Sequence, residues 1–91
     1  MNSIHLEIRG RVQGVGFRWF VRETARALGL RGWVKNRPDG SVELAAAGTE
    51  EAVRQLELAV GRGPRGAVVE HVDEHPAPDG RSLPAEFTIL R

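Results

Sequence analysis

The chain has 91 residues, of which 41% are hydrophobic and 27% are charged, and it contains no cysteine. One hydrophobic core fits this length, so we predict a single domain over residues 1–91. The lack of thiols excludes a disulfide scaffold and any catalytic or metal site built on cysteine. The formal net charge is only +1, yet residues 1–40 carry a net charge of +5 and residues 41–91 a net charge of −4. The basic half indicates a local anion-binding site, and the alternative is that its arginines form an ordinary solvated surface.

Neither a membrane segment nor a secretory signal is visible in the sequence. The longest apolar runs are only a few residues, far short of the about 20 residues that a membrane-spanning helix needs. Residues 1–11 lack the basic flank followed by an apolar stretch that marks a secretory signal. We therefore expect a cytoplasmic protein with no membrane partner.

A strand is predicted from Ile4 through Val12, because apolar and polar residues alternate at its start. After a loop, apolar residues recur at helical spacing from Phe17 to Leu28, and Gly29 is a plausible end for that helix. The glycines that open the loop are Gly10, Gly14 and Gly16. This arrangement predicts a strand, a glycine loop and a helix that begins directly after the loop.

Residues 30–47 are predicted to form a β-hairpin, because two strand-like segments flank the turn sequence Arg-Pro-Asp-Gly at positions 37–40. A second helix is expected after Thr49, a good N-cap, and it ends at the glycines at positions 61 and 63. A further strand is expected around residues 68–72 and a short final one over residues 87–90. Leu58 and Trp19 fall opposite the apolar faces of their helices, so both are expected at the surface.

The predicted order is β-α-β-β-α-β followed by a short tail strand. Two helices interleaved with four strands in this order indicate an α+β, ferredoxin-like split β-α-β sandwich, with an antiparallel sheet of four strands plus a short C-terminal strand and both helices on one face. Proteins of many functions share that fold, so the fold alone does not decide the function.

The glycine loop is the first candidate site. Glycines allow backbone N–H groups to converge without obstruction, and beside the positive end of a helix dipole such a loop binds anions. Arg18 stands in the first helical turn, where its guanidinium is able to clamp a phosphate or carboxylate. The alternative is a tight turn with a surface arginine. The residues predicted to form the anion cradle are Gln13, Gly14, Val15, Gly16, Phe17 and Arg18.

Asn36 is the second candidate. An asparagine at the junction of a strand and a turn is commonly a turn former. In a split β-α-β sheet, however, the first loop and the end of the second strand lie at the same edge, so Asn36 is also placed to face the anion site. Its amide both donates and accepts hydrogen bonds, which suits it to hold a water molecule.

The sequence gives little indication of a metal site, of a carboxylate pair for acid–base catalysis or of a nucleic-acid-binding surface. The three histidines, His5, His71 and His75, have no metal-ligand spacing, and we expect surface or half-buried positions for them. No paired carboxylates lie near the glycine loop, and no metal site is predicted. The strand predicted over residues 41–48 lacks the aromatic residues with which RNA-recognition domains of this topology stack bases, so we expect no nucleic-acid partner.

Two segments together resemble a known family. Gly10 to Arg18, with the sequence GRVQGVGFR, resembles the first signature of the acylphosphatase family. Gly32 to Val42, with the sequence GWVKNRPDGSV and followed by Gly48, resembles the second. Both occur in the order and spacing of the family, and neither departs from its pattern. The C-terminal region adds little to the resemblance.

The resemblance implies a small ferredoxin-like hydrolase that cleaves acyl phosphates to a carboxylate and inorganic phosphate, without a metal or another cofactor. In the family, the arginine of the first signature binds the phosphoryl group and the asparagine of the second orients the attacking water. These roles map onto Arg18 and Asn36. The implied partners are a small acyl phosphate and inorganic phosphate, and we expect a monomer.

The resemblance agrees with the chemistry of the residues. An acyl phosphate has a good leaving group, so its hydrolysis needs a charge clamp and an in-line water more than acid catalysis. The competing hypothesis is a non-catalytic module of the same fold that senses an anion or a protein partner. N-terminal domains of hydrogenase-maturation carbamoyltransferases share the motif pair, but nothing is appended here, so we expect a stand-alone enzyme.

Overall fold

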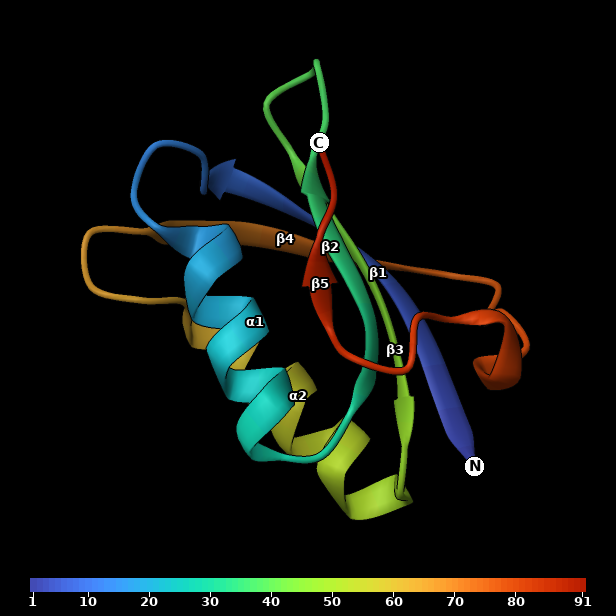
Figure 1. Ribbon diagram of the computed structural model, residues 1–91. Helices are drawn as coiled ribbons and strands as arrows, with labels where there is room; N and C mark the ends of the chain where they lie inside the picture. Colours follow the sequence, from blue (N-terminus) through green and yellow to red (C-terminus); the bar gives the residue numbers. More distant parts are fainter.

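The elements follow one another in the predicted order, and the computed structural model describes residues 1–91 (Figure 1). They are β1 (Asn2–Arg11), α1 (Phe17–Ala27), β2 (Arg31–Asn36), β3 (Val42–Gly48), α2 (Glu50–Arg62), β4 (Val68–His75), the short 3₁₀ helix η1 (Gly80–Ser82) and β5 (Thr88–Ile89). In Figure 1 the β1–α1 loop, the β2–β3 turn and the C-terminus lie toward the same end of the molecule, the upper one in that view. The predicted site residues belong to this end.

The strands form one five-stranded sheet in the order β4-β1-β3-β2-β5. Neighbours are antiparallel except for β2 and β5, which run parallel with Val34 opposite Ile89. The predicted four-stranded antiparallel sheet is therefore present, and the short C-terminal strand extends it at the β2 edge. The Leu90 N–H also donates to the Val34 carbonyl at 2.8 Å. The end of the chain is thus held beside the strand that carries Asn36.

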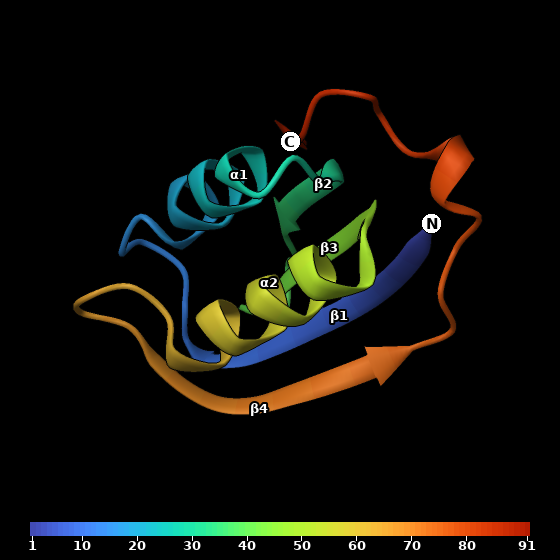
Figure 2. The same ribbon diagram turned by 90° about the horizontal axis from the view of Figure 1, so that it is seen from below.

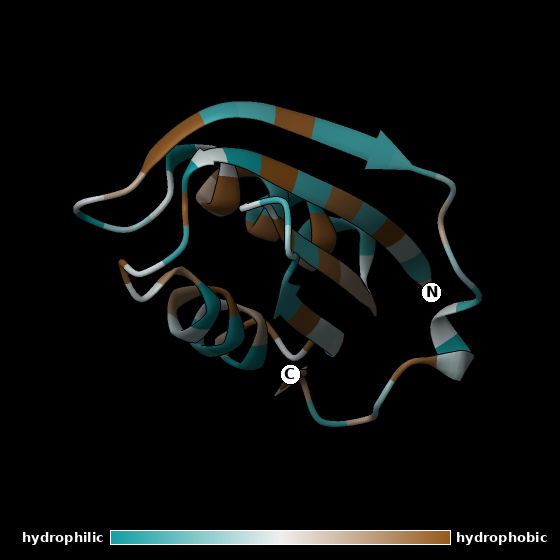
Figure 3. Cartoon of the chain, turned by 90° about the horizontal axis from the view of Figure 1, so that it is seen from above, coloured by the Kyte–Doolittle hydropathy of each residue, from teal (hydrophilic) through white to brown (hydrophobic).

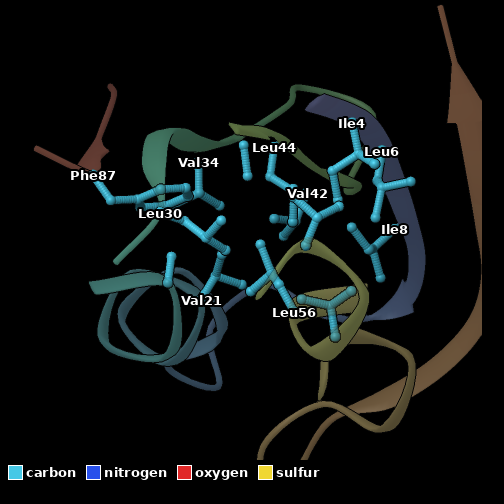
Figure 4. Close-up of a cluster of buried hydrophobic side chains, with 14 of the residues drawn as sticks. Ile4, Leu6, Ile8, Val21, Leu30, Val34, Val42, Leu44, Leu56 and Phe87 are labelled. Atoms are coloured by element: carbon cyan, nitrogen blue, oxygen red, sulfur yellow. The ribbon is translucent and has the colours of Figure 1, made fainter. Parts of the chain in front are cut away.

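Both helices cover one face of the sheet, and the hydrophobic core lies between the two layers (Figure 2). Apolar and polar residues alternate along β1, as the colours in Figure 3 show, so that Ile4, Leu6 and Ile8 all point toward the helices. Figure 4 shows these side chains in one cluster with Val21 of α1 and Leu56 of α2. Because burying one such side chain contributes about 1.5–3 kcal/mol, this core holds the layers together without a disulfide.

The two helices begin differently. α2 begins after Thr49, as predicted, and the Thr49 Oγ1 accepts a hydrogen bond from the Ala52 N–H at 3.2 Å. α1 has no such cap, because Gly16 precedes it in the left-handed conformation and its first turn contains no acidic residue. The first N–H groups of α1 therefore lack a side-chain acceptor.

The outer surfaces of both helices agree with the sequence pattern. Trp19 and Leu58 are 59% and 57% exposed. α2 continues through Gly61 and ends at Arg62, so that only Gly63, which caps the helix, acts as a stop signal. None of the helices is both long and apolar enough to cross a membrane.

Gly10 lies inside β1 and not in the loop to which its glycine neighbours belong. The pairing of β1 with β4 shifts register between Arg9 and Gly10. At this bulge Gly10 has a φ of 132°, and a Cβ there would overlap the carbonyl oxygen of Val68 on β4. The close approach of the two strands thus requires glycine. β1 ends at Arg11, and Val12, predicted as part of the strand, is buried just beyond it.

Candidate active site

The loop between β1 and α1 presents a row of unpaired backbone N–H groups. Gly14 and Gly16 both have a φ of 77°, in the left-handed region that glycine adopts without steric cost. No backbone carbonyl or side chain of the protein accepts a hydrogen bond from the N–H groups of residues 13–19. Successive free N–H groups at the start of a helix form a favourable site for an anion.

Arg18 adds a positive charge to this loop. It lies in the first turn of α1 and lines a pocket of about 440 Å³, together with Gly14, Gly16 and Asn36. Arg22, one helical turn later, pairs with Glu23 at 3.0 Å, whereas Arg18 has no carboxylate partner in the protein. The Arg18 guanidinium is therefore available to a bound anion.

Asn36 reaches the same pocket from the sheet. It is the last residue of β2, and its side chain points to the helix side, like that of Val34 two residues earlier. The Oδ1 atom is buried and has no hydrogen-bond partner in the protein. A buried acceptor without a partner is unfavourable, so this atom marks a position for a water molecule or a ligand group.

The Gln13 side chain ties the loop to the turn that follows Asn36. Its Nε2 donates hydrogen bonds to the backbone carbonyls of Arg37 and Ser41, both at 2.8 Å. These carbonyls stand at the two ends of the β2–β3 turn, which is also closed by a 2.9 Å bond from the Arg37 N–H to the Ser41 carbonyl. Gln13 therefore connects the two sides of the site through its side chain, while its N–H belongs to the unpaired row.

Carboxylates hold the same turn from the other face of the sheet. Arg37 Nη1 donates to Glu43 Oε1 at 2.9 Å. The Ser41 Oγ lies 2.7 Å from both Glu7 Oε2 and Asp39 Oδ1. The hydroxyl and the N–H of Ser41 donate to Asp39 and lower the pKa of that carboxyl. The turn that carries the candidate asparagine is thus anchored on both faces.

The histidines lie away from the pocket. His5 and His75 are on the sheet face opposite the helices, where His5 contacts Glu43 at 2.5 Å and His75 contacts Glu7 at 3.2 Å. These pairs were not predicted, because the partners come from different strands. His71 is exposed. No group of three or more His, Cys, Asp or Glu side chains is arranged to hold a metal ion.

The structure divides the residues predicted for the anion cradle. Gly14, Gly16, Phe17 and Arg18 line the pocket. Gln13 and Val15 do not line it, and Val15 packs against the hydrophobic core, to which Phe17 also belongs. The predicted residues thus contribute to the pocket unequally, although their N–H groups form one continuous row.

Part of the pocket wall was missed by sequence reasoning. The missed residues are Val12, Trp19, Arg22, Thr88, Ile89 and Arg91. Arg22 follows Arg18 by four residues, and this helical spacing was a usable signal. No local signal marks the three C-terminal residues, because β5 reaches the site only through its pairing with β2.

The sequence and the fold were compared with those of known proteins. A family model described as Acylphosphatase matches residues 4–89. The chain belongs to the acylphosphatase family. It is 55% identical over 82 residues to the acylphosphatase of Nitratidesulfovibrio vulgaris (strain DP4), a match that covers 88% of this chain and 81% of that protein.

Solved structures agree with this assignment to the acylphosphatase family. The crystal structure of acylphosphatase from Bacillus subtilis has a TM-score of 0.86 at 40% identity, and the match covers 100% of both chains. The crystal structure of T.kodakarensis HypF has a TM-score of 0.84 at 29% identity and matches 100% of this chain, but only 12% of that one. The family inferred from the two signatures and the ferredoxin-like fold predicted from the order of the elements are confirmed.

Proposed function

We propose that the protein hydrolyses the carboxyl–phosphate bond of acyl phosphates without a metal. In this proposal Arg18 and the backbone N–H groups of the loop over residues 13–18 bind the phosphoryl oxygens, and Asn36 orients the attacking water. The water oxygen forms a bond to phosphorus, while the bond between phosphorus and the carboxylate oxygen breaks. The products are a carboxylate and inorganic phosphate.

The observation that carries the proposal is the composition of one pocket. It combines an arginine without a carboxylate partner, a row of unpaired N–H groups and a buried amide oxygen without a partner. The arginine and the N–H groups are donors that match phosphoryl oxygens. The Asn36 Oδ1 is an acceptor, so it binds an O–H of water and not the phosphoryl group.

The pocket offers no general base, since no aspartate, glutamate or histidine side chain lines it. The carboxylate leaving group is stable at neutral pH and needs no proton. We propose that the proton of the attacking water passes to a phosphoryl oxygen of the substrate. Catalysis then rests on positioning and on electrostatic stabilisation of the transferred phosphoryl group.

Hydrolysis of benzoyl phosphate in the presence of EDTA tests this function. We expect equal amounts of benzoate and phosphate, released at a rate that is proportional to the protein and unaffected by the chelator. A non-catalytic anion-binding module would give a phosphate-dependent rise in Tm without any acceleration over spontaneous hydrolysis. Activity that is lost in EDTA and restored by a divalent cation would contradict the metal-independent mechanism.

That the protein is cytoplasmic, is a monomer and has no nucleic-acid partner stays a prediction. Gel filtration at assay concentrations measures the oligomeric state directly.

The proposal assigns a positioning role to the Gln13 side chain. Gln13→Met keeps the length of the side chain but removes both hydrogen bonds to the turn. Because small displacements of a reacting group reduce rates by up to about 100-fold, we expect kcat to fall about 10- to 100-fold. The inhibition constant of inorganic phosphate is expected to stay within about twofold, since the N–H row and Arg18 remain.

A second variant separates positioning from folding. In Gln13→Glu the ionised carboxylate faces two carbonyl oxygens and has no proton to donate, so turnover is expected to fall at neutral pH. As the pH falls and the carboxyl takes up a proton, one hydrogen bond returns and kcat recovers in part. The matched control is Ser3→Ala, which removes the 2.6 Å bond to the Pro78 carbonyl away from the pocket. Parallel losses of kcat and phosphate affinity in Gln13→Met would contradict the positioning role.

Turnover is expected not to depend on any histidine. His5→Gln, His71→Gln and His75→Gln are each expected to keep kcat within about twofold of the wild type, because these side chains lie outside the pocket. The pH profile of kcat measured for each variant checks this expectation. A large loss in one variant, with an unchanged Tm, would require a general-base role that the proposed mechanism lacks.

A further inference from the structure

The pocket is larger than a phosphoryl group requires. Beyond the glycine loop, its wall is built by Trp19 and Arg22 of α1 and by Thr88, Ile89 and Arg91 at the end of the chain. None of these side chains has a role in the proposed chemistry. They line the same pocket as Arg18, and the acyl part of a substrate extends from the phosphoryl group into the rest of that pocket.

The charged side chains that line this pocket are all basic. Arg18, Arg22 and Arg91 line the pocket, and no acidic side chain does. The Nε of Arg22 donates to Glu23 Oε2 at 3.0 Å, but its two terminal nitrogens have no partner in the protein. One guanidinium is enough to bind the phosphoryl group, so Arg22 leaves a second set of donors free for another anionic group.

Trp19 supplies an apolar surface beside this second cation. It is 59% exposed, so it does not contribute to the core. Trp19 and Arg22 are three residues apart on α1 and therefore share a side of the helix. A flat indole next to a guanidinium suits a ligand with an apolar body and a charged end.

We propose that this wall is an acyl-group subsite which selects acyl phosphates of dicarboxylic acids, with Arg22 binding the second carboxylate and Trp19 contacting the chain that links the two groups. The inference rests on the proposed function, because the substrate must bind with its phosphoryl group at Arg18. A carboxylate fits the planar fork of a guanidinium, which binds both of its oxygens.

Two substrates of similar size test the subsite. We would measure kcat/KM for 4-carboxybenzoyl phosphate and for 4-methylbenzoyl phosphate, whose para substituents are unable to reach the reacting carbonyl. The ratio of the two values is compared between the wild type and Arg22→Gln, so that the intrinsic reactivities of the substrates cancel. We expect the ratio to fall about three- to tenfold in Arg22→Gln, with little change for the methyl compound.

Arg65→Gln is the matched control, because it removes the same charge from an exposed position outside the pocket. We expect its ratio to equal that of the wild type, and Arg22→Lys to retain part of the preference. An equal ratio in wild type and Arg22→Gln would overturn the subsite and leave the proposed function intact. An equal fall in Arg65→Gln would assign the effect to overall charge and also overturn it. If the wild type hydrolyses benzoyl phosphate but neither para-substituted compound, the subsite is overturned and the proposed function stands. If it hydrolyses none of the three, the proposed function itself fails.

Discussion

Arg18→Ala is expected to hydrolyse benzoyl phosphate about 10²–10³ times more slowly than the wild type, because one electrostatic donor to a transition state typically contributes that factor. Phosphate inhibition is expected to weaken as well, since the same guanidinium binds the phosphoryl oxygens of substrate and product. Arg18 has no protein carboxylate partner, so its removal breaks no internal ion pair. The Tm is therefore expected to stay close to that of the wild type. Steady-state kinetics, phosphate inhibition and thermal melting measure the three quantities.

Two variants accompany this prediction. Arg18→Lys keeps the charge but loses the planar fork, so only part of the activity is expected to return. Arg65→Ala removes an exposed arginine outside the pocket and is expected to behave like the wild type. Near-normal turnover in Arg18→Ala would overturn the assignment of Arg18 as the phosphoryl-binding residue.

Asn36→Ala is expected to lose most of its turnover while it keeps its affinity for phosphate. In the proposed mechanism the amide contacts the attacking water, and the phosphoryl group is held by Arg18 and the loop. Losing the group that orients the nucleophile therefore lowers kcat and leaves phosphate inhibition nearly unchanged. Arg18 variants are expected to lose both turnover and phosphate affinity. Comparing variants of Arg18 and Asn36 therefore distinguishes phosphoryl binding from the chemical step.

Melting of Asn36→Ala separates this role from a purely structural one. The Asn36 Oδ1 has no hydrogen-bond partner in the protein, so its removal is expected to cost about 1 kcal/mol or less of folding free energy. The turn that follows it keeps the bonds from Gln13 and from Ser41. A folded Asn36→Ala protein that retains most of its turnover would exclude the water-orienting role. The proposed phosphoryl clamp would then rest on Arg18 and the loop alone.

The sequence by itself determined the order of the elements and most of the candidate site. Apolar alternation at Ile4, Leu6 and Ile8 defines the buried face of β1, because successive side chains of a strand point to opposite sides. Gly14 and Gly16 mark the loop, because its backbone conformation disfavours other residues. These signals are local, and therefore they are readable without the fold.

Other features depended on contacts between residues far apart in the chain. Gly10 belongs to a strand and not to the loop, because β4 approaches it at a bulge. The Gln13 side chain reaches carbonyls 24 and 28 residues away. Neither role has a local pattern, since each depends on which segments the sheet brings together.

The tertiary structure alone decided how the pocket is completed. β5 is only two residues long and pairs with β2 in parallel, which brings Thr88 and Ile89 into the wall of the pocket that Asn36 also lines. The Asn36 Oδ1 is left without a partner by the same packing, and no property of the sequence around it distinguishes this asparagine from a simple turn former. Local sequence determines backbone conformation and the buried faces, whereas the partners of a polar atom are set by the long-range pairing of strands.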